Sequence, residues 1–120
     1  MIAFARRKLD DGETSSLSSI QELTPKAICD SAAEGDEVGQ ATVRHVARYI
    51  GIAVANLINL LSPDVIAIGG GISAAGSLIL DPIVVSAEDN TLEGMFEHTR
   101  IELAKLGNDA GSIGAAYLVM

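Results

Sequence analysis

The sequence of 120 residues has few of the residues that cross-link or stiffen a fold. It has no tryptophan and only two tyrosines and two phenylalanines, so its core must be built from aliphatic side chains. Its single cysteine, Cys29, excludes an internal disulfide and fits a reducing compartment. Cys29, His45 and His98 are too few and too scattered to indicate a metal site, so we assign no metal ligand.

Basic residues and long apolar runs are also scarce. The chain has 8 lysines and arginines against 16 acidic residues, a formal charge of −8, which argues against nucleic acid or an anionic membrane as a partner of this segment. The longest apolar run, Ile50 to Leu61, includes two asparagines and is too short to span a bilayer. The first residues lack the long apolar region of a signal peptide, so we expect a cytoplasmic protein.

The spacing of the hydrophobic residues, 48% of the chain, predicts an α/β fold. Two short strands joined by a helix predict a parallel pair with a right-handed crossover. The expected order is the end of a helix at 2–9, a polar surface loop at 10–23, a short helix from Pro25, a long helix ending near Leu61, a strand at 65–68, a helix at 75–87, a strand at 101–106 and a helix at 112–119.

Capping residues mark where several helices begin. Thr24 followed by Pro25 predicts one helix start, and Asp36 predicts the start of the long helix. Pro82 either begins a second short helix capped by Asp81 or kinks the helix at 75–87. One face of the long helix, which we expect to be a central support buried on several sides, carries Val43, Val46, Ile50, Val54, Leu57 and Leu61.

The most informative stretch is an apolar strand that runs into three glycines. Residues 65–68 read as a strand buried on both faces, and Gly69, Gly70 and Gly71 form a loop with almost no side chains. Such a loop is either a tight turn or a place where a nucleotide comes close to the backbone. With Ala74 the glycines also fit a dinucleotide-binding pattern, which makes an NAD-binding module a remote alternative.

Residues for catalysis are not apparent in the sequence. We assign no catalytic residue, because no Ser/His/Asp set or Walker-type phosphate motif is present. His45 is expected to be a solvated residue of the long helix. Asp109, between two glycines after the second strand, caps the last helix or contacts a ligand. Asn56 and Asn59 are expected to make structural hydrogen bonds on a buried helix.

Two segments resemble the signatures of a known family. Residues 49–73, from Tyr49 to Ser73, closely resemble the signature of the ROK family (repressors, open reading frames and sugar kinases), and residues 107–116 resemble that family's C-terminal motif. The resemblance implies the C-terminal part of an actin-like ATPase (ribonuclease H-like) sugar-kinase fold, helix-rich with at least two parallel strands. Residues 24–120 would form an incomplete nucleotide-binding subdomain, after an upstream helix end and surface loop at 1–23.

The resemblance also implies a function. Gly69, Gly70, Gly71, Ile72 and Ser73 would contact the adenosine part of ATP. The parent would be an ATP- and Mg²⁺-dependent hexose kinase of the glucokinase type, converting ATP and D-glucose to ADP and glucose 6-phosphate. The family's phosphate motif, catalytic base and zinc loop have no counterpart in this chain, so the fragment alone is expected to be inactive.

Several alternatives stay open at this level. A sugar-responsive ROK-type transcriptional repressor would carry the same C-terminal motifs. The motifs do not distinguish which hexose is bound, or whether ATP or polyphosphate is the phosphate donor. The family resemblance and the apolar helix together predict a homo-oligomer.

Overall fold

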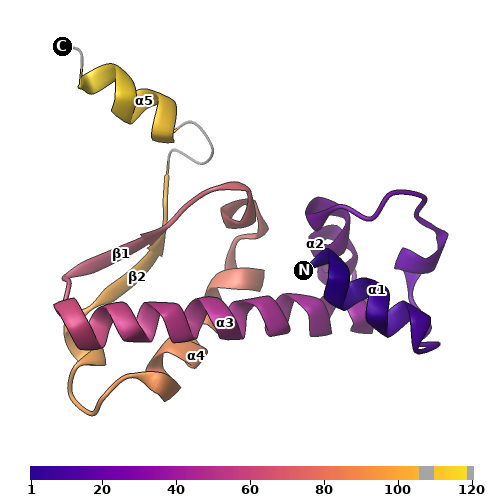
Figure 1. Ribbon diagram of the computed structural model, residues 1–120, viewed down its shortest axis with the longest axis horizontal. Helices are drawn as coiled ribbons and strands as arrows, with labels where there is room; N and C mark the ends of the chain where they lie inside the picture. The colour runs from indigo at the N-terminus through magenta and orange to yellow at the C-terminus, as the bar shows by residue number, and fades with distance from the viewer. Residues whose placement is uncertain (106–109, 119–120) are drawn as a thin grey trace.

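The computed structural model describes residues 1–105 and 110–118, and its architecture is a long helix that carries helices at one end and a small sheet at the other (Figure 1). Strands β1 and β2 pair in parallel, with Val65 opposite Arg100 and Ile68 opposite Leu103. The predicted helix, strand, helix, strand order is confirmed. The elements are α1 (Ile2–Asp10), η1 (Ser16–Ser19), α2 (Pro25–Ala33), α3 (Glu37–Leu61), β1 (Val65–Ile68), η2 (Gly71–Ala75), α4 (Ser77–Asn90), η3 (Phe96–His98), β2 (Arg100–Leu103) and α5 (Ala110–Tyr117), where η denotes a 3-10 helix.

Both predicted helix caps are confirmed. The Thr24 hydroxyl accepts a hydrogen bond from the backbone N–H of Ala27 at 3.1 Å, at the start of α2. The Asp36 carboxylate accepts one from the N–H of Gly39 at 2.9 Å, at the start of α3. These bonds satisfy backbone donors that have no partner within the first turn of a helix.

Asp36 also ties the segment at 10–23 to the helices. Its carboxylate accepts hydrogen bonds from the Ser15 hydroxyl at 2.9 Å and from the Ser16 backbone N–H at 2.8 Å. Burial alone would raise the pKa of Asp36, but these hydrogen bonds and the one from Gly39 outweigh it and lower the pKa. Leu17 and Leu23 of the same segment are buried, so this loop contributes to the core.

Two apolar clusters form the core. The smaller one joins α1, η1, α2 and the start of α3 through Ala5, Leu17, Leu23, Ile28 and Val38. The larger one lies where α3 crosses α4 and where both helices meet the sheet. Its buried members are Ala32, Val43, Ala47, Val54, Ile58, Ile68, Ile79, Ile83 and Ala87.

A glycine sets the spacing of α3 and α4. A Cβ atom at Gly51 would lie 2.5 Å from Cβ of Ser86 and 2.8 Å from the carbonyl oxygen of Ile83, closer than real Cβ contacts allow. The Ser86 hydroxyl donates a hydrogen bond to the Arg48 carbonyl at 2.9 Å across the same crossing. The absence of a side chain at Gly51 therefore lets the two helices touch.

The predicted burial of α3 is wrong in its C-terminal half. Leu57 is 45% exposed and Leu61 is 65% exposed, whereas Ala55 and Ile58 are fully buried. The buried stripe runs through Ala47, Gly51, Val54 and Ile58, because the small residues on this stripe allow α4 to approach closely. Leu57, Leu60 and Leu61, on another side of α3, are exposed in the described part of the chain.

The expectations for β1 and α4 also need correction. β1 is not buried on both faces: Val65 is 40% exposed and Ala67 is exposed, because in the described residues α3 and α4 cover one face of the sheet. α4 is a single helix that includes Pro82 and continues to Asn90, so no second helix begins at Asp81.

His45 is not the solvated residue that the sequence predicts. Its ring stacks on Phe4 of α1 with the centroids 3.8 Å apart, and it meets the edge of Tyr49 at 5.1 Å. Burial, with a smaller contribution from the positive charges of Arg7, the N-terminus and Arg48, lowers the pKa of His45. Among the described residues, none of the helices is long and apolar enough to cross a membrane.

Candidate functional site

The glycine loop makes a short 3-10 helix between β1 and α4. Gly70 has a φ of +84°, a conformation that L side chains rarely adopt, so glycine is required there. The Ser73 hydroxyl and backbone N–H both donate hydrogen bonds to the Gly70 carbonyl, at 2.8 Å and 3.1 Å. The loop is therefore closed by its own hydrogen bonds. The short helix η2, which begins in this loop, lies on the side of the molecule where α2 lies.

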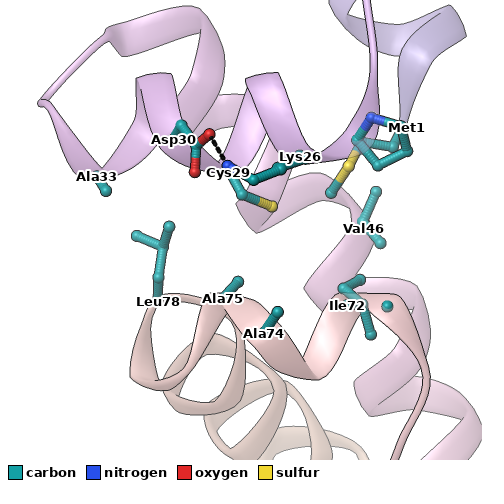
Figure 2. A pocket seen from close by; sticks show the side chains of 12 residues that line it. Met1, Lys26, Cys29, Asp30, Ala33, Val46, Ile72, Ala74, Ala75 and Leu78 are labelled. Atoms are coloured by element: carbon teal, nitrogen blue, oxygen red, sulfur yellow. Dashed lines mark hydrogen bonds and ion pairs between the residues drawn. The ribbon is translucent and has the colours of Figure 1, made fainter. Parts of the chain in front are cut away.

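A cleft of about 800 Å³ separates α2 from η2 and the start of α4. Figure 2 shows side chains of α2 on one wall and Ile72, Ala74, Ala75 and Leu78 on the opposite wall. A volume of this size is within the range of small-molecule sites, which run from about 300 to 1,000 Å³. The lining residues are Met1, Pro25, Lys26, Cys29, Asp30, Ala33, Val46, Gly71, Ile72, Ala74, Ala75 and Leu78.

The walls of the cleft are mostly apolar, and its two charged side chains are paired with each other. Lys26 and Asp30 form an ion pair one helical turn apart, drawn as a dashed line in Figure 2. The hydrogen bond and charge of Asp30 raise the pKa of Lys26. Burial, and to a smaller extent the Asp30 carboxylate, raises the pKa of the Cys29 thiol, which keeps it neutral at neutral pH. The cleft therefore offers a mostly apolar surface to a ligand.

The structure places the five predicted site residues differently. Gly71 and Ile72 line the cleft. Gly69 and Gly70 lie before it along the chain, where they complete the turn out of β1, and the Ser73 side chain bonds back to Gly70. Gly71 has no atom within 4 Å of the position that a Cβ would take, so its backbone is open to an approaching ligand.

Sequence reasoning missed the α2 wall of the cleft. Lys26, Cys29, Asp30 and Ala33 follow the i, i+3, i+4, i+7 spacing of one helix face, and this face looks onto η2. That spacing was visible in the sequence, but nothing in it indicated that the glycine loop would lie opposite. Met1 and Val46, which complete the lining, carry no local signal for a site.

The other polar residues singled out in the sequence have structural roles or lie elsewhere. Asn59 donates a hydrogen bond to the Asn90 carbonyl at 3.3 Å and accepts one from the Leu92 N–H at 2.9 Å, which confirms its structural role. Asn56 is exposed, contrary to the expectation of a buried position. Asp109 lies outside the described residues. Within residues 1–105 and 110–118, His, Cys, Asp and Glu form no group that could hold a metal ion.

The family model of the ROK family matches residues 3–120. The chain belongs to the ROK family. This ROK chain is 42% identical over 97 residues to a glucokinase of Halalkalibacterium halodurans, a match that covers 81% of the chain and 29% of the relative. It is also 31% identical over 105 residues to a xylose repressor of Caldicellulosiruptor bescii, covering 88% of the chain and 26% of that protein.

A solved structure agrees with both the family and the fold. The ROK chain matches a ROK family glucokinase from Streptomyces griseus, solved in complex with glucose and AMPPNP, with a TM-score of 0.86 and 31% identity. The match covers 98% of the ROK chain and 40% of that structure. The fold is therefore part of the actin-like ATPase fold, as predicted. The chain spans well under half the length of these relatives.

Proposed function

We propose that this ROK chain is the C-terminal, adenosine-binding part of an ATP-dependent hexose kinase of the glucokinase type. The parent would convert ATP and D-glucose to ADP and glucose 6-phosphate. The observation that supports this most is the apolar cleft between α2 and η2, because the glycine loop that the sequence singles out forms one of its walls through Gly71 and Ile72. The glucokinase relative and the AMPPNP-bound structural neighbour support the same conclusion.

The chemistry of the cleft fits the base and ribose better than the phosphates. Its walls are largely apolar, and Asp30 is already paired with Lys26. We expect the adenine ring to lie between α2 and η2, with the open backbone at Gly71 against the nucleotide. The five proposed contact residues remain Gly69, Gly70, Gly71, Ile72 and Ser73.

The rest of the chemistry would come from other parts of the parent. Phosphoryl transfer depends on positioning and on charge stabilisation, with Mg²⁺ neutralising charge on the phosphates. The described residues offer no group of acidic side chains for this ion, so we assign its ligands, and the base that accepts the sugar hydroxyl proton, to other parts of the protein. We also expect the parent to be cytoplasmic.

The binding proposal is tested by titrating the chain with ATP. Gly71→Leu should weaken ATP binding at least about tenfold, because it adds a side chain in the cleft where a Cβ meets nothing within 4 Å. Ala53→Leu is the control, since Ala53 is an exposed residue of α3 and does not line the cleft. Equal affinities of the wild type and Gly71→Leu, or tighter binding of NADH than of ATP, would contradict the proposal.

The isolated chain should show no glucokinase turnover with glucose, ATP and Mg²⁺. The relevant measurement is a coupled assay of glucose 6-phosphate formation. Turnover approaching the range of about 1–100 s⁻¹ that is typical of kinases would show that the essential groups are present after all.

A repressor is the second candidate for the parent. The xylose repressor of C. bescii matches 88% of this chain, so the family's C-terminal part occurs in both kinds of protein. The gene sequence upstream of Met1 separates the two candidates. A helix-turn-helix segment there would favour a repressor, whereas an intact phosphate motif and catalytic base would favour the kinase.

A further inference from the structure

Two charged side chains lie on the α2 wall of the cleft. Among the described residues that line the cleft, Lys26 and Asp30 are the charged ones, and the other side chains are apolar apart from the weakly polar thiol of Cys29. Lys26 and Asp30 form an ion pair one helical turn apart, so they present a hydrogen-bond donor beside an acceptor (Figure 2). A ligand in the cleft can therefore be oriented by this pair.

The ion pair is exposed enough to exchange its partners for a ligand. The side chain of Lys26 is 84% exposed and that of Asp30 is 58% exposed. An ion pair at this exposure contributes little to stability, so a ligand that rearranges it meets little resistance. Lys26 donates to the Oδ2 atom of Asp30, and the two oxygens of a carboxylate have room for further donors.

The chemistry of the pair matches one edge of an adenine ring. Adenine carries an amino group that donates hydrogen bonds beside a ring nitrogen that accepts them. The Asp30 carboxylate accepts and the Lys26 ammonium donates, so one orientation of the ring satisfies both groups. A purine with an oxygen in place of the amino group, such as guanine, would present an acceptor to the carboxylate in the same orientation.

We propose that Asp30 selects adenine among purine bases, by accepting a hydrogen bond from the 6-amino group while Lys26 donates to the adjacent ring nitrogen. The inference rests on the proposed binding of ATP in this cleft and adds the recognition of the base to it. The wall opposite α2 carries Ala74 and Ala75, whose small side chains leave room for a ring between the two walls (Figure 2).

Titration of the chain with two nucleotides that differ in the 6-amino group tests the proposal. ATP and purine riboside 5′-triphosphate share the ribose and the phosphates, but the second lacks this group. The wild type should bind ATP about fivefold or more tightly than the analogue, because a hydrogen bond to a charged group is lost. Asp30→Ala should remove the preference and bring the two dissociation constants within about twofold of each other. Since both ligands carry the same phosphates, the ratio is insensitive to the lost negative charge.

Lys26→Met is the matched control. It breaks the same ion pair but keeps the Asp30 carboxylate, and both nucleotides have the ring nitrogen that Lys26 contacts. The two affinities should therefore fall together, and the preference for ATP should persist. Circular dichroism establishes that each variant remains folded.

The outcomes separate this inference from the proposed function. If the wild type binds neither nucleotide, the proposed ATP site is wrong and the inference is overturned with it. If the wild type binds ATP no more tightly than the analogue, or if Asp30→Ala keeps the preference, the cleft binds a nucleotide without reading its base through Asp30. Loss of the preference in Lys26→Met would assign it to the ion pair and likewise overturn the role of Asp30.

Discussion

The two halves of α3 are both rich in apolar residues, yet its exposed leucines all lie in the second half. In the N-terminal half, Val38, Val43 and Ala47 are buried, and the helix start is capped by Asp36. In the C-terminal half, Leu57, Leu60 and Leu61 are 45%, 78% and 65% exposed. An apolar sequence pattern therefore predicts that a helix face is buried, but it does not predict which segment packs on that face.

The exposure of the C-terminal half of α3 is consistent with the small share of the relatives' length that this chain covers. The chain covers 29% of the glucokinase relative and 40% of the S. griseus glucokinase structure. In the described part of the chain, α1, η1 and α2 pack around the start of α3, while β1, β2 and α5 lack a second layer. In the described residues, the first part therefore buries its apolar side chains among its own helices, whereas the second part leaves several of them exposed.

The largest expected effect is on stability, and it differs between two neighbouring residues in the C-terminal half of α3. Ile58 is fully buried against α4 and the sheet, so Ile58→Ala should lower the free energy of unfolding by about 2–5 kcal/mol. Leu57→Ala, at a residue that is 45% exposed, should cost less than about 1 kcal/mol. Urea denaturation of the two variants measures the difference. Equal losses would contradict the burial of only one of these two faces of α3.

A smaller effect is expected at the start of α3. Asp36→Ala should lower the free energy of unfolding by about 0.5–2 kcal/mol, because it removes the cap and the bonds from Ser15 and Ser16. Asp30→Ala, which removes an exposed ion pair with Lys26, should have little effect. If the two variants are equally stable, Asp36 does not hold the N-terminal half together.

The same carboxylate gives the N-terminal half a pH dependence. The pKa of Asp36 is lower in the folded state than in the unfolded state. Its stabilisation is therefore complete above the unfolded pKa of about 3.9 and is lost as the pH falls through the lower folded pKa. The wild type should lose more stability over this acidic range than Asp36→Ala does. Parallel pH profiles of the two proteins would contradict this origin of the stability.

Local sequence signals predicted the elements well. Thr24, Asp36 and the triple glycine mark helix starts and a loop by chemistry that acts within a few residues, and each prediction for their positions is confirmed. The burial of Leu57 and Leu61 was predicted wrongly, because both faces of α3 are apolar and the choice between them depends on Gly51 and Ser86, which are distant in sequence.

The candidate site could be predicted only in part. The glycine loop pointed to Gly71 and Ile72, which line the cleft. The opposite wall comes from α2, and its position depends on how α2 packs on α3, for which no short motif exists. The family resemblance supplied the fold, but the cleft required the packing of elements that are about 40 residues apart in the sequence.

Alkylation of Cys29 tests the central claim, that ATP binds in the cleft between α2 and η2, most directly. Cys29 is the only cysteine and lines this cleft, so a thiol reagent reports on one position. The raised pKa of its thiol favours a mildly alkaline assay, in which more thiolate is present. We predict that saturating ATP slows the modification of Cys29 at least about tenfold and that glucose alone does not. An unchanged rate in the presence of bound ATP would place the nucleotide elsewhere and contradict the account.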